Sequence, residues 1–290
     1  MRITALDIFP VDIPLAEPIF MSNVELHASS NVLIRLTTDD GVIGWGEAVE
    51  APHMSGDTQR HIIAGILALR PLVIGADPMD RAGLWRTLHH AIHGNASARS
   101  AIDMAVHDLV GRALGVSVST LLGAVPGAEV PLMTLFGHGD PDGDLETFRA
   151  RKAAGFRWFK LKLGIGPVEA EIETIRRVSA ELGGAVLAGD ANGGWDLSTA
   201  NRFLRAVADQ PVRFIEQPVM DRDTLVRLAH GSPIALCADE TAGSLAAIAG
   251  YGPTSVAGVS LKLIKLGGIS GLMQGAAACG AASLDRKSVV

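Results

Sequence analysis

The feature that most constrains the fold is a repeat in the second half of the chain, where strand-like segments alternate with helical ones. From the second onward, each strand-like segment ends in a residue capable of chemistry: Lys162, Asp190, Glu216, Asp239 and Lys262, at separations of 28, 26, 23 and 23 residues. Repeated βα units of this length predict a parallel sheet, either open or closed into a barrel. Because the carboxyl ends of barrel strands converge on one mouth, the repeat favours a (β/α) TIM-type barrel.

The number of strand-like segments falls short of a complete barrel. Six are present, at 130–136, 158–163, 185–190, 213–217, 234–239 and 257–262, and helical segments lie between and after them. A closed TIM barrel has eight strands, so we expect a C-terminally truncated barrel over residues 123–282, with about six of eight strands and two exposed edges. Residues 283–290 do not continue the preceding helical pattern, and one back-translation of 285–290 reads as a common sequencing-adapter sequence. We expect this tail to be non-native.

Residues 1–122 predict an α+β capping domain. A strand at 3–13 and a hairpin at 31–47, turning at Asp39-Asp-Gly41, precede helical periodicity at 58–69, 79–89 and 98–114. The segment 123–129 is rich in small residues and proline and is the best linker candidate. We expect loops at 17–30 and 48–57, between these elements.

Composition narrows the class of protein. The net charge of −6 does not indicate binding to nucleic acid or to an anionic membrane. The two cysteines, Cys237 and Cys279, lie in apolar runs and predict reduced core residues, not a disulfide framework. The sequence shows no charged-then-apolar leader and no apolar run of the roughly 18 residues that a membrane helix needs. We therefore expect a soluble, cytoplasmic protein.

Two lysines, Lys160 and Lys162, alternate with apolar residues in the strand-like stretch 158–164. Side chains alternate along a strand, so both ammonium groups project from one face. Like charges on an inward face disfavour each other, and such a pair needs a functional reason. The alternative is an edge strand whose lysines face water.

The strand-end residues form a chemically coherent set. Asp190, Glu216 and Asp239 come from adjacent strands, and three neighbouring carboxylates need a cation. An all-oxygen set suits Mg²⁺ or Mn²⁺, not zinc. Lys162 and Lys262 flank the carboxylates, where a metal ion and a second ammonium would favour the neutral amine and allow general acid/base work. This layout predicts removal of the proton α to a substrate carboxylate through an enediolate.

The chain resembles the enolase superfamily, specifically the muconate lactonizing subgroup of the mandelate racemase/muconate lactonizing enzyme family. The barrel motifs that carry the resemblance are Lys160-Leu-Lys162, Asp190-Ala-Asn192, Glu216-Gln-Pro218, Ala238-Asp-Glu240 and Leu261-Lys-Leu-Ile-Lys-Leu-Gly-Gly268. The cap motifs are Gly44-Trp-Gly-Glu47 and the segment 98–108. The resemblance implies Mg²⁺ at Asp190, Glu216 and Asp239, acid/base roles for Lys162 and Lys262, and Lys160 near the substrate carboxylate. It also implies that 17–30 and 48–57 are specificity loops over the barrel mouth.

Several residues near these motifs have more modest interpretations. By alternation, Glu240 points away from the face of Asp239, so we expect it to support the site from behind. Lys265 lies past the predicted strand end, where a surface role is favoured over an acid/base one. Asn192 either supports the site or caps a turn, and His138 lines the mouth or is an ordinary loop histidine. A cluster at His89, His90 and His93 is expected to be solvated.

The reaction remains open at this level. We expect an isomerase that acts on a small-molecule carboxylate by racemisation, epimerisation or cycloisomerisation, and a homo-oligomer for the full-length protein. The same intermediate permits β-elimination, as in a dehydratase. A Schiff-base aldolase would use one lysine as nucleophile but leaves the carboxylates without a purpose. A catalytically inactive truncated fragment is the non-enzymatic alternative.

Overall fold

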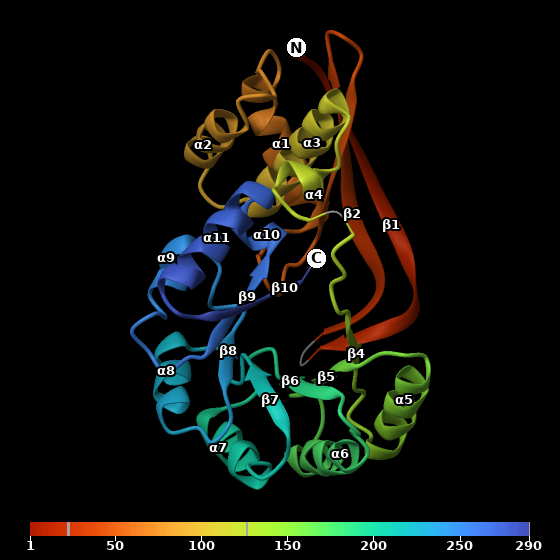
Figure 1. Cartoon of the computed structure of the whole chain (residues 1–290), viewed down its shortest axis with the longest axis vertical. Coiled ribbons are helices and arrows are strands. Elements are labelled where there is room, and N and C mark those ends of the chain that lie inside the picture. Colours follow the sequence, from red (N-terminus) through yellow and green to blue (C-terminus); the bar gives the residue numbers. More distant parts are fainter. Residues whose placement is uncertain (22–23, 126, 290) are drawn as a thin grey trace.

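The protein consists of an α+β part stacked on a curved parallel sheet that is surrounded by helices (Figure 1). The computed structural model describes residues 1–21, 24–125 and 127–289. The first part contains strands β1 (Ile3–Met21), β2 (Val24–Thr38) and β3 (Ile43–Val49), and helices α1 (Gln59–Val73), α2 (Arg81–Ala91), α3 (Ala96–Leu114) and α4 (Val118–Leu121). This arrangement confirms the predicted α+β region before the barrel units.

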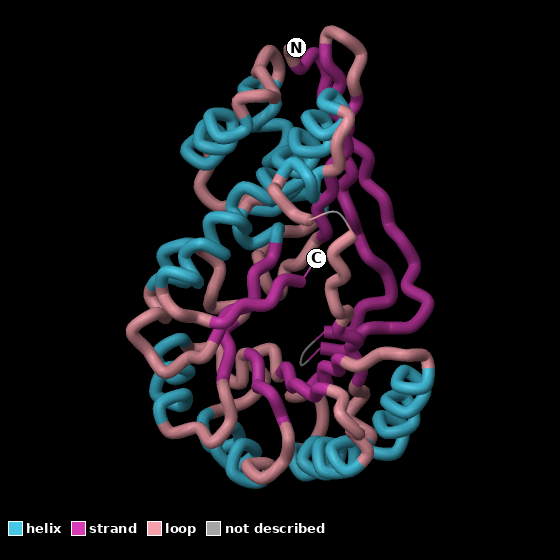
Figure 2. Tube along the Cα trace, viewed as in Figure 1, coloured by secondary structure: helices cyan, strands magenta, loops and turns pink. Residues whose placement is uncertain are grey.

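The second part alternates strands and helices as the repeat predicts. Its strands are β4 (Met133–Phe136), β5 (Trp158–Lys162), β6 (Val186–Asp190), β7 (Val212–Glu216), β8 (Leu236–Ala238), β9 (Gly258–Lys262) and β10 (Asp285–Val289). Its helices are α5 (Pro141–Ala153), α6 (Val168–Ala180), α7 (Leu197–Ala206), α8 (Arg222–His230), α9 (Leu245–Ala249), α10 (Leu263–Leu266) and α11 (Ile269–Ala281). The strands form an arc with helices along its outside (Figure 2).

In the first part, an antiparallel sheet in the order β1-β2-β3 packs on α3. Val32, Ile34 and Leu36 alternate along β2 and are fully buried on this face. The sheet and helix approach so closely that a Cβ added to Gly46 would lie 2.0 Å from the Ala101 carbonyl oxygen. The Gly-Trp-Gly motif is therefore a packing requirement of the cap.

The segment 17–30 is not the predicted loop. Strand β1 runs to Met21, and β2 pairs with it antiparallel from Val24, so these residues form the end of a long hairpin; residues 22–23 lie outside the described chain. Figure 1 shows the hairpin reaching from the cap down to the barrel strands. The mixed polar and apolar sequence hides the strand because much of this extension is exposed, with little of the one-sided burial that produces an alternating pattern.

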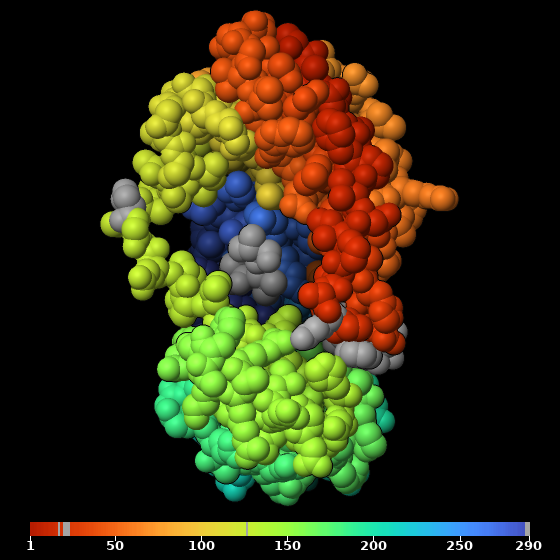
Figure 3. Space-filling view, turned by 90° about the vertical axis from the view of Figure 1, so that its right-hand side faces the viewer, coloured from red at the N-terminus to blue at the C-terminus, as the bar shows by residue number. Residues whose placement is uncertain are grey.

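The parallel sheet has seven strands in the order β10-β9-β8-β7-β6-β5-β4. Within the described residues, β4 and β10 are its two edges and do not pair with each other. Figure 3 shows a hollow between the cap and the green barrel units, with the blue C-terminal part visible inside it. The predicted incomplete TIM-type barrel is confirmed as an open arc.

The sheet has one strand more than the six expected from the sequence, because residues 285–289 form β10. This strand pairs in parallel with β9, from Asp285 opposite Gly258 to Val289 opposite Lys262. Leu284, just before the strand, is buried. The polar sequence of the tail gives no strand signal, but the edge of β9 offers unpaired backbone groups that any extended segment can use. The non-native origin of the tail stays a prediction.

Each part has its own hydrophobic core, and a few contacts join the two. Asp103 of α3 accepts hydrogen bonds from the Ser270 backbone N–H (2.9 Å) and the Ser270 hydroxyl (2.7 Å). The Trp85 indole Nε1 donates to the Gly267 carbonyl oxygen at 3.2 Å. The cap is thereby fixed to the segment that follows β9. No helix in the described part of the chain is long and apolar enough to cross a membrane.

Candidate active site

The strand-end residues of the repeat lie together at one end of the arc. Lys162 of β5 stands opposite Asp190 of β6, and Asp190 stands opposite Glu216 of β7. Asp239 follows β8 directly, and Lys262 ends β9. The three carboxylate residues are at most 1% exposed, although charged side chains are seldom buried without partners.

The two lysines of β5 share one face, as alternation predicts, and both contact Asp190. Lys160 Nζ lies 2.6 Å from Asp190 Oδ2 and 3.1 Å from Glu216 Oε1. Lys162 Nζ lies 2.9 Å from the same Asp190 oxygen. Both lysines are more than nine-tenths buried, which excludes the alternative of an edge strand whose lysines face water.

Two further lysines hold Asp239 from the other side. Lys262 Nζ lies 2.5 Å from Asp239 Oδ2, and Lys265 Nζ lies 2.6 Å from Asp239 Oδ1. The expected surface position of Lys265 is wrong, because its side chain is 2% exposed and also donates to the Ser260 carbonyl oxygen. Helix α10 starts directly after Lys262, and three residues along a helix bring a side chain back to the same face.

Lys287 of β10 also reaches the cluster, and no sequence pattern predicts this position. Its ammonium forms an ion pair with Glu216 Oε2. Burial lowers the pKa of Lys287 to about 8, against the opposing effect of Glu216. Lys287 could be predicted only if β10 were known to be a strand, and the polar sequence of the tail does not indicate one.

The buried charged groups of this cluster shift one another's pKa values. Burial alone would lower the pKa of Lys160, but Asp190 and Glu216 outweigh it and raise that pKa well above its usual value. Burial would raise the pKa values of Asp190 and Asp239, yet their lysine partners hold both below the usual range. Burial raises the pKa of Glu216. The cluster is thus a set of tightly coupled ion pairs.

Two amides brace the site. The Gln217 side-chain oxygen accepts from the Asp239 backbone N–H at 2.8 Å and from the Thr241 hydroxyl at 2.9 Å, which fixes the end of β8. Asn192 Oδ1 accepts from Lys162 Nζ at 2.7 Å, and Asn192 Nδ2 donates to Glu240 at 2.9 Å. These contacts agree with the expected supporting positions of Asn192 and Glu240. Gln217 lies in a quoted motif, but alternation alone does not reveal its bracing contacts.

A loop of the cap covers one side of the lysine–carboxylate cluster. Residues 50–57 form the predicted loop, closed by a bridge between Ala51 and Asp57, although residues 48 and 49 belong to β3. Met54 Sδ lies 3.4 Å from Lys262 Nζ. Burial lowers the pKa of His53, and the charges of Lys262 and Lys162 lower it further. Neither residue has a sequence signal beyond its place in the loop.

The end of the β1–β2 hairpin covers the opposite side. Pro18, Ile19 and Lys162 line one cavity of about 220 Å³, together with Phe136 and His138. His138 therefore lies at the mouth, one of its two expected positions. The hairpin and the 50–57 loop approach the acid/base candidates from two directions.

The donor set fits a divalent cation of the Mg²⁺ type. Among the described residues, no three His, Cys, Asp or Glu side chains are grouped as ligands around one point. Lysine ammonium groups contact the carboxylates instead. However, Asp190, Glu216 and Asp239 are buried, offer only oxygen, and come from adjacent strands. Hard cations such as Mg²⁺ and Mn²⁺ prefer such oxygen ligands. The residues present are thus compatible with the ion.

Comparison with known proteins identifies the family. Residues 3–123 match the model for the mandelate racemase / muconate lactonizing enzyme N-terminal domain, and residues 145–286 match the enolase C-terminal domain-like model. The chloromuconate cycloisomerase CbnB of Cupriavidus necator is 33% identical over 298 residues, which cover 98% of this chain and 79% of the relative. The chain belongs to the mandelate racemase/muconate lactonizing enzyme family, within the enolase superfamily.

Other members of this family show the range of reactions around the chain. The cis-3-hydroxy-L-proline dehydratase of Roseibium aggregatum is 30% identical over 279 residues, covering 93% of this chain and 74% of that protein. The crystal structure of the N-succinyl Arg/Lys racemase from Bacillus cereus superposes with a TM-score of 0.95 at 26% identity, covering 100% of this chain and 80% of that one. Relatives of this chain thus include isomerases and a dehydratase of one superfamily.

Proposed function

We propose that this chain is a Mg²⁺-dependent enzyme that removes the proton α to a carboxylate of a small molecule, through an enediolate, as a racemase, an epimerase or a cycloisomerase. The observation that carries the proposal is the placement of Lys162 and Lys262 on opposite sides of three buried carboxylates. Lys162 contacts Asp190 at one end of the set, and Lys262 contacts Asp239 at the other. A substrate held at the carboxylates would present one face to each lysine.

Asp190, Glu216 and Asp239 are the residues that would hold the metal ion. When bound, Mg²⁺ supplies positive charge that stabilises negative charge developing on a substrate carboxylate. Lys160, buried between Asp190 and Glu216, adds a fixed positive charge beside the same position. Its raised pKa keeps it protonated, so Lys160 suits charge stabilisation and does not suit proton removal.

Lys162 and Lys262 are the proposed acid/base pair. Asn192 Oδ1 accepts a hydrogen bond from Lys162 Nζ and orients it. Lys262 Nζ has the soft sulfur of Met54 and the Asp239 carboxylate as neighbours. One amine accepts the α-proton at Nζ while the other, as an ammonium, donates a proton to the opposite face. This exchange inverts the α-carbon in a racemase or epimerase.

The cap residues exclude water and set the substrate range. Pro18 and Ile19 of the hairpin bring apolar surface beside Lys162, and Met54 does so beside Lys262. An apolar cover strengthens the electrostatic interactions beneath it. We propose that the hairpin and the 50–57 loop select the substituent on the α-carbon.

Elimination of a β-substituent is the second candidate. The same lysine that removes the α-proton would start it, and the observation in favour is the similarity to the hydroxyproline dehydratase. The third candidate is an inactive fragment, and the observation in its favour is the open arc of seven strands. A Schiff-base aldolase is disfavoured because both lysines are engaged with carboxylates that such an enzyme does not need.

The test is deuterium uptake from D₂O into a pool of α-substituted carboxylates, including N-acyl amino acids, dipeptides, proline derivatives and hydroxy acids. Mass spectrometry would read all members of the pool with Mg²⁺ and with EDTA. We expect uptake in at least one class, with Mg²⁺ only. Uptake that persists in EDTA would contradict the metal-dependent mechanism, and no uptake in any class would favour the inactive fragment.

A further inference from the structure

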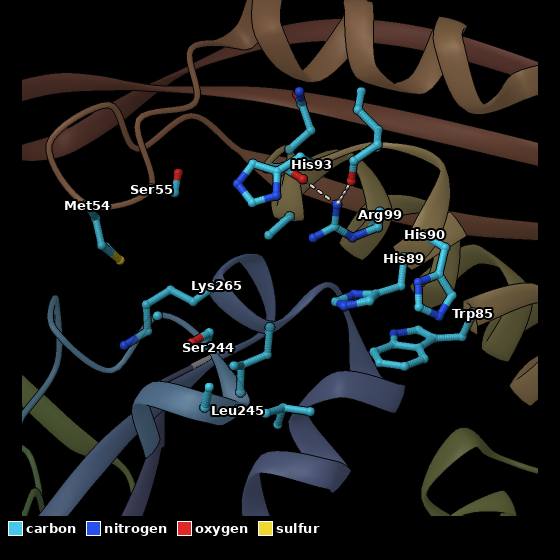
Figure 4. A pocket seen from close by; sticks show the side chains of 17 residues that line it. Met54, Ser55, Trp85, His89, His90, His93, Arg99, Ser244, Leu245 and Lys265 are labelled. Carbon is cyan, nitrogen blue, oxygen red and sulfur yellow. Dashed lines mark hydrogen bonds between the residues drawn. The ribbon is translucent and has the colours of Figure 1, made fainter. Parts of the chain in front are cut away.

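A cavity that the proposed reaction does not use lies between the cap and the barrel. It has a volume of about 820 Å³ and lies between the α2–α3 segment of the cap and the α9–α10 segment of the barrel (Figure 4). Among its described lining residues there is no Asp or Glu, whereas Arg99, three histidines and Lys265 all line it. We propose that this cavity binds a small oxyanion, a carboxylate or a phosphate, with Arg99 as the principal positive charge.

Arg99 is a buried charge without a carboxylate partner. Its side chain is 7% exposed, and its Nη1 donates to main-chain carbonyl oxygens, that of Ile92 at 3.1 Å and that of Gly94. No carboxylate in the described chain forms an ion pair with it within 4.0 Å, and Nε has no hydrogen-bond partner there. A buried guanidinium without a countercharge is costly, and an anion in the cavity would supply that charge.

The charges around Arg99 also favour an anion in the cavity. Burial lowers the pKa of Arg99, and the charge of Asp57 opposes this only in part. Burial also lowers the pKa of His89, and the charges of Arg99 and His90 lower it further. The lowered pKa of His89 favours its neutral form, so Arg99 and Lys265 supply the positive charge of the described lining, which has no Asp or Glu. The field favours a negatively charged occupant.

Histidine and tryptophan side chains line the cavity on the same side as Arg99. His89, His90 and His93 are exposed, as predicted, but they border this cavity, and Figure 4 shows them beside Arg99. The Trp85 and His89 rings stack with centroids 5.0 Å apart, and the Trp85 indole is held by its hydrogen bond to Gly267. Imidazole N–H groups can donate to an oxyanion, and the ring stack offers a flat apolar surface beside it.

The cavity is distinct from the proposed active site but adjoins it. Lys265 belongs to both, and its ammonium is already bonded to Asp239. Met54 and Ser55 also line the cavity, and Met54 Sδ is the atom that contacts Lys262 Nζ. An occupant would thus lie against the loop that covers the acid/base cluster. The inference itself does not depend on the proposed reaction.

Ser244 offers a matched pair of test variants. It lines the cavity, is exposed, and caps α9 by accepting a hydrogen bond from the Ala247 N–H at 3.1 Å. Asp and Asn both replace serine well at this position of a helix. Ser244→Asp places a carboxylate in the cavity, whereas Ser244→Asn has the same shape without the charge. Arg99 itself is a poorer choice, because its removal also frees the Ile92 and Gly94 carbonyl oxygens.

The experiment is calorimetric titration of the full chain, in EDTA, with inorganic phosphate and with benzoate. We expect saturable binding of at least one probe to the wild type and to Ser244→Asn, and at least tenfold weaker binding to Ser244→Asp. The tighter probe identifies a phosphate or a carboxylate as the ligand. A further variant, Lys162→Ala, should keep the wild-type affinity for the probe.

Three results would overturn the proposal. The first is the absence of saturable binding of either probe to the wild type. The second is equal affinity in Ser244→Asp and Ser244→Asn. The third is a loss of affinity in Lys162→Ala as large as that in Ser244→Asp, which would place the anion at the acid/base cluster.

Discussion

Lys265 Nζ lies 2.6 Å from Asp239 Oδ1, and both side chains are almost completely buried. Removing Lys265 takes the partner from the buried Oδ1, and only Lys262 then pairs with the Asp239 carboxylate, through Oδ2. We therefore expect Lys265→Met to lower the free energy of unfolding by about 1–3 kcal/mol, the usual cost of a buried polar group that loses its partner. Urea denaturation measures the change. Arg213→Met, at an exposed position of β7, is the control and should stay within about 0.5 kcal/mol of the wild type; equal losses in both variants would contradict the role of the pair.

Stability against acid should depend on Asp239. Its lysine partners outweigh burial and hold its folded-state pKa below the ordinary value of 3.8. A carboxyl group with a lowered pKa stabilises the folded state above the unfolded pKa, and this contribution disappears as pH falls towards the folded pKa. We expect the metal-free wild type to lose stability between about pH 5 and 3 more steeply than Asp239→Asn, by up to about 1.4 kcal/mol per pH unit. Parallel pH profiles from urea titrations would refute this assignment.

The cap should tolerate no side chain at Gly46. An added Cβ would lie 2.0 Å from the Ala101 carbonyl oxygen, so β3 and α3 would have to separate. We expect Gly46→Ala to destabilise the protein by about 1–3 kcal/mol, in the range of overpacked cores. Gly231→Ala is the matched control, because nothing lies within 4 Å of its added Cβ. Thermal or urea unfolding measures both variants, and equal stability of Gly46→Ala and Gly231→Ala would contradict the close packing of β3 on α3.

Mg²⁺ should stabilise the folded chain through the three carboxylates. At a concentration 100 times its Kd, a ligand adds about 2.7 kcal/mol to the free energy of unfolding. We expect Glu216→Gln to lose most of this gain, since it removes one of three proposed ligands. Glu173→Gln, an exposed residue of α6, should keep it. Urea titrations with Mg²⁺ and with EDTA provide the comparison, and an undiminished gain in Glu216→Gln would exclude Glu216 as a ligand.

The barrel and the carboxylate–lysine cluster could be predicted because they follow simple periodicities. Alternation along β5 places Lys160 and Lys162 on one face, and the regular βα spacing places Asp190, Glu216 and Asp239 at one mouth. The physical rule is the same in both cases: regular secondary structure converts sequence spacing into position. The structure brings all six predicted site residues together, while their catalytic and metal-binding roles stay predictions.

The parts that escaped prediction depend on tertiary contacts. Lys265 is buried because α10 starts immediately after β9 and turns it back onto Asp239. Lys287 reaches Glu216 only because the polar tail pairs with the edge of β9. Gln217 braces Asp239 across two strands, and Met54 meets Lys262 from another part of the chain. Such contacts leave no local pattern for sequence reasoning to detect.

The central claim is that Lys162 and Lys262 act on opposite faces of one substrate. The most direct measurement is α-proton exchange in D₂O, followed separately for each enantiomer of a substrate found in the pooled assay, with wild type, Lys162→Ala and Lys262→Ala. Each variant should abolish racemisation, and each should lose exchange of a different enantiomer by about 10²–10⁴-fold, the usual contribution of a general base. Wild-type exchange of both enantiomers in both variants would contradict the account.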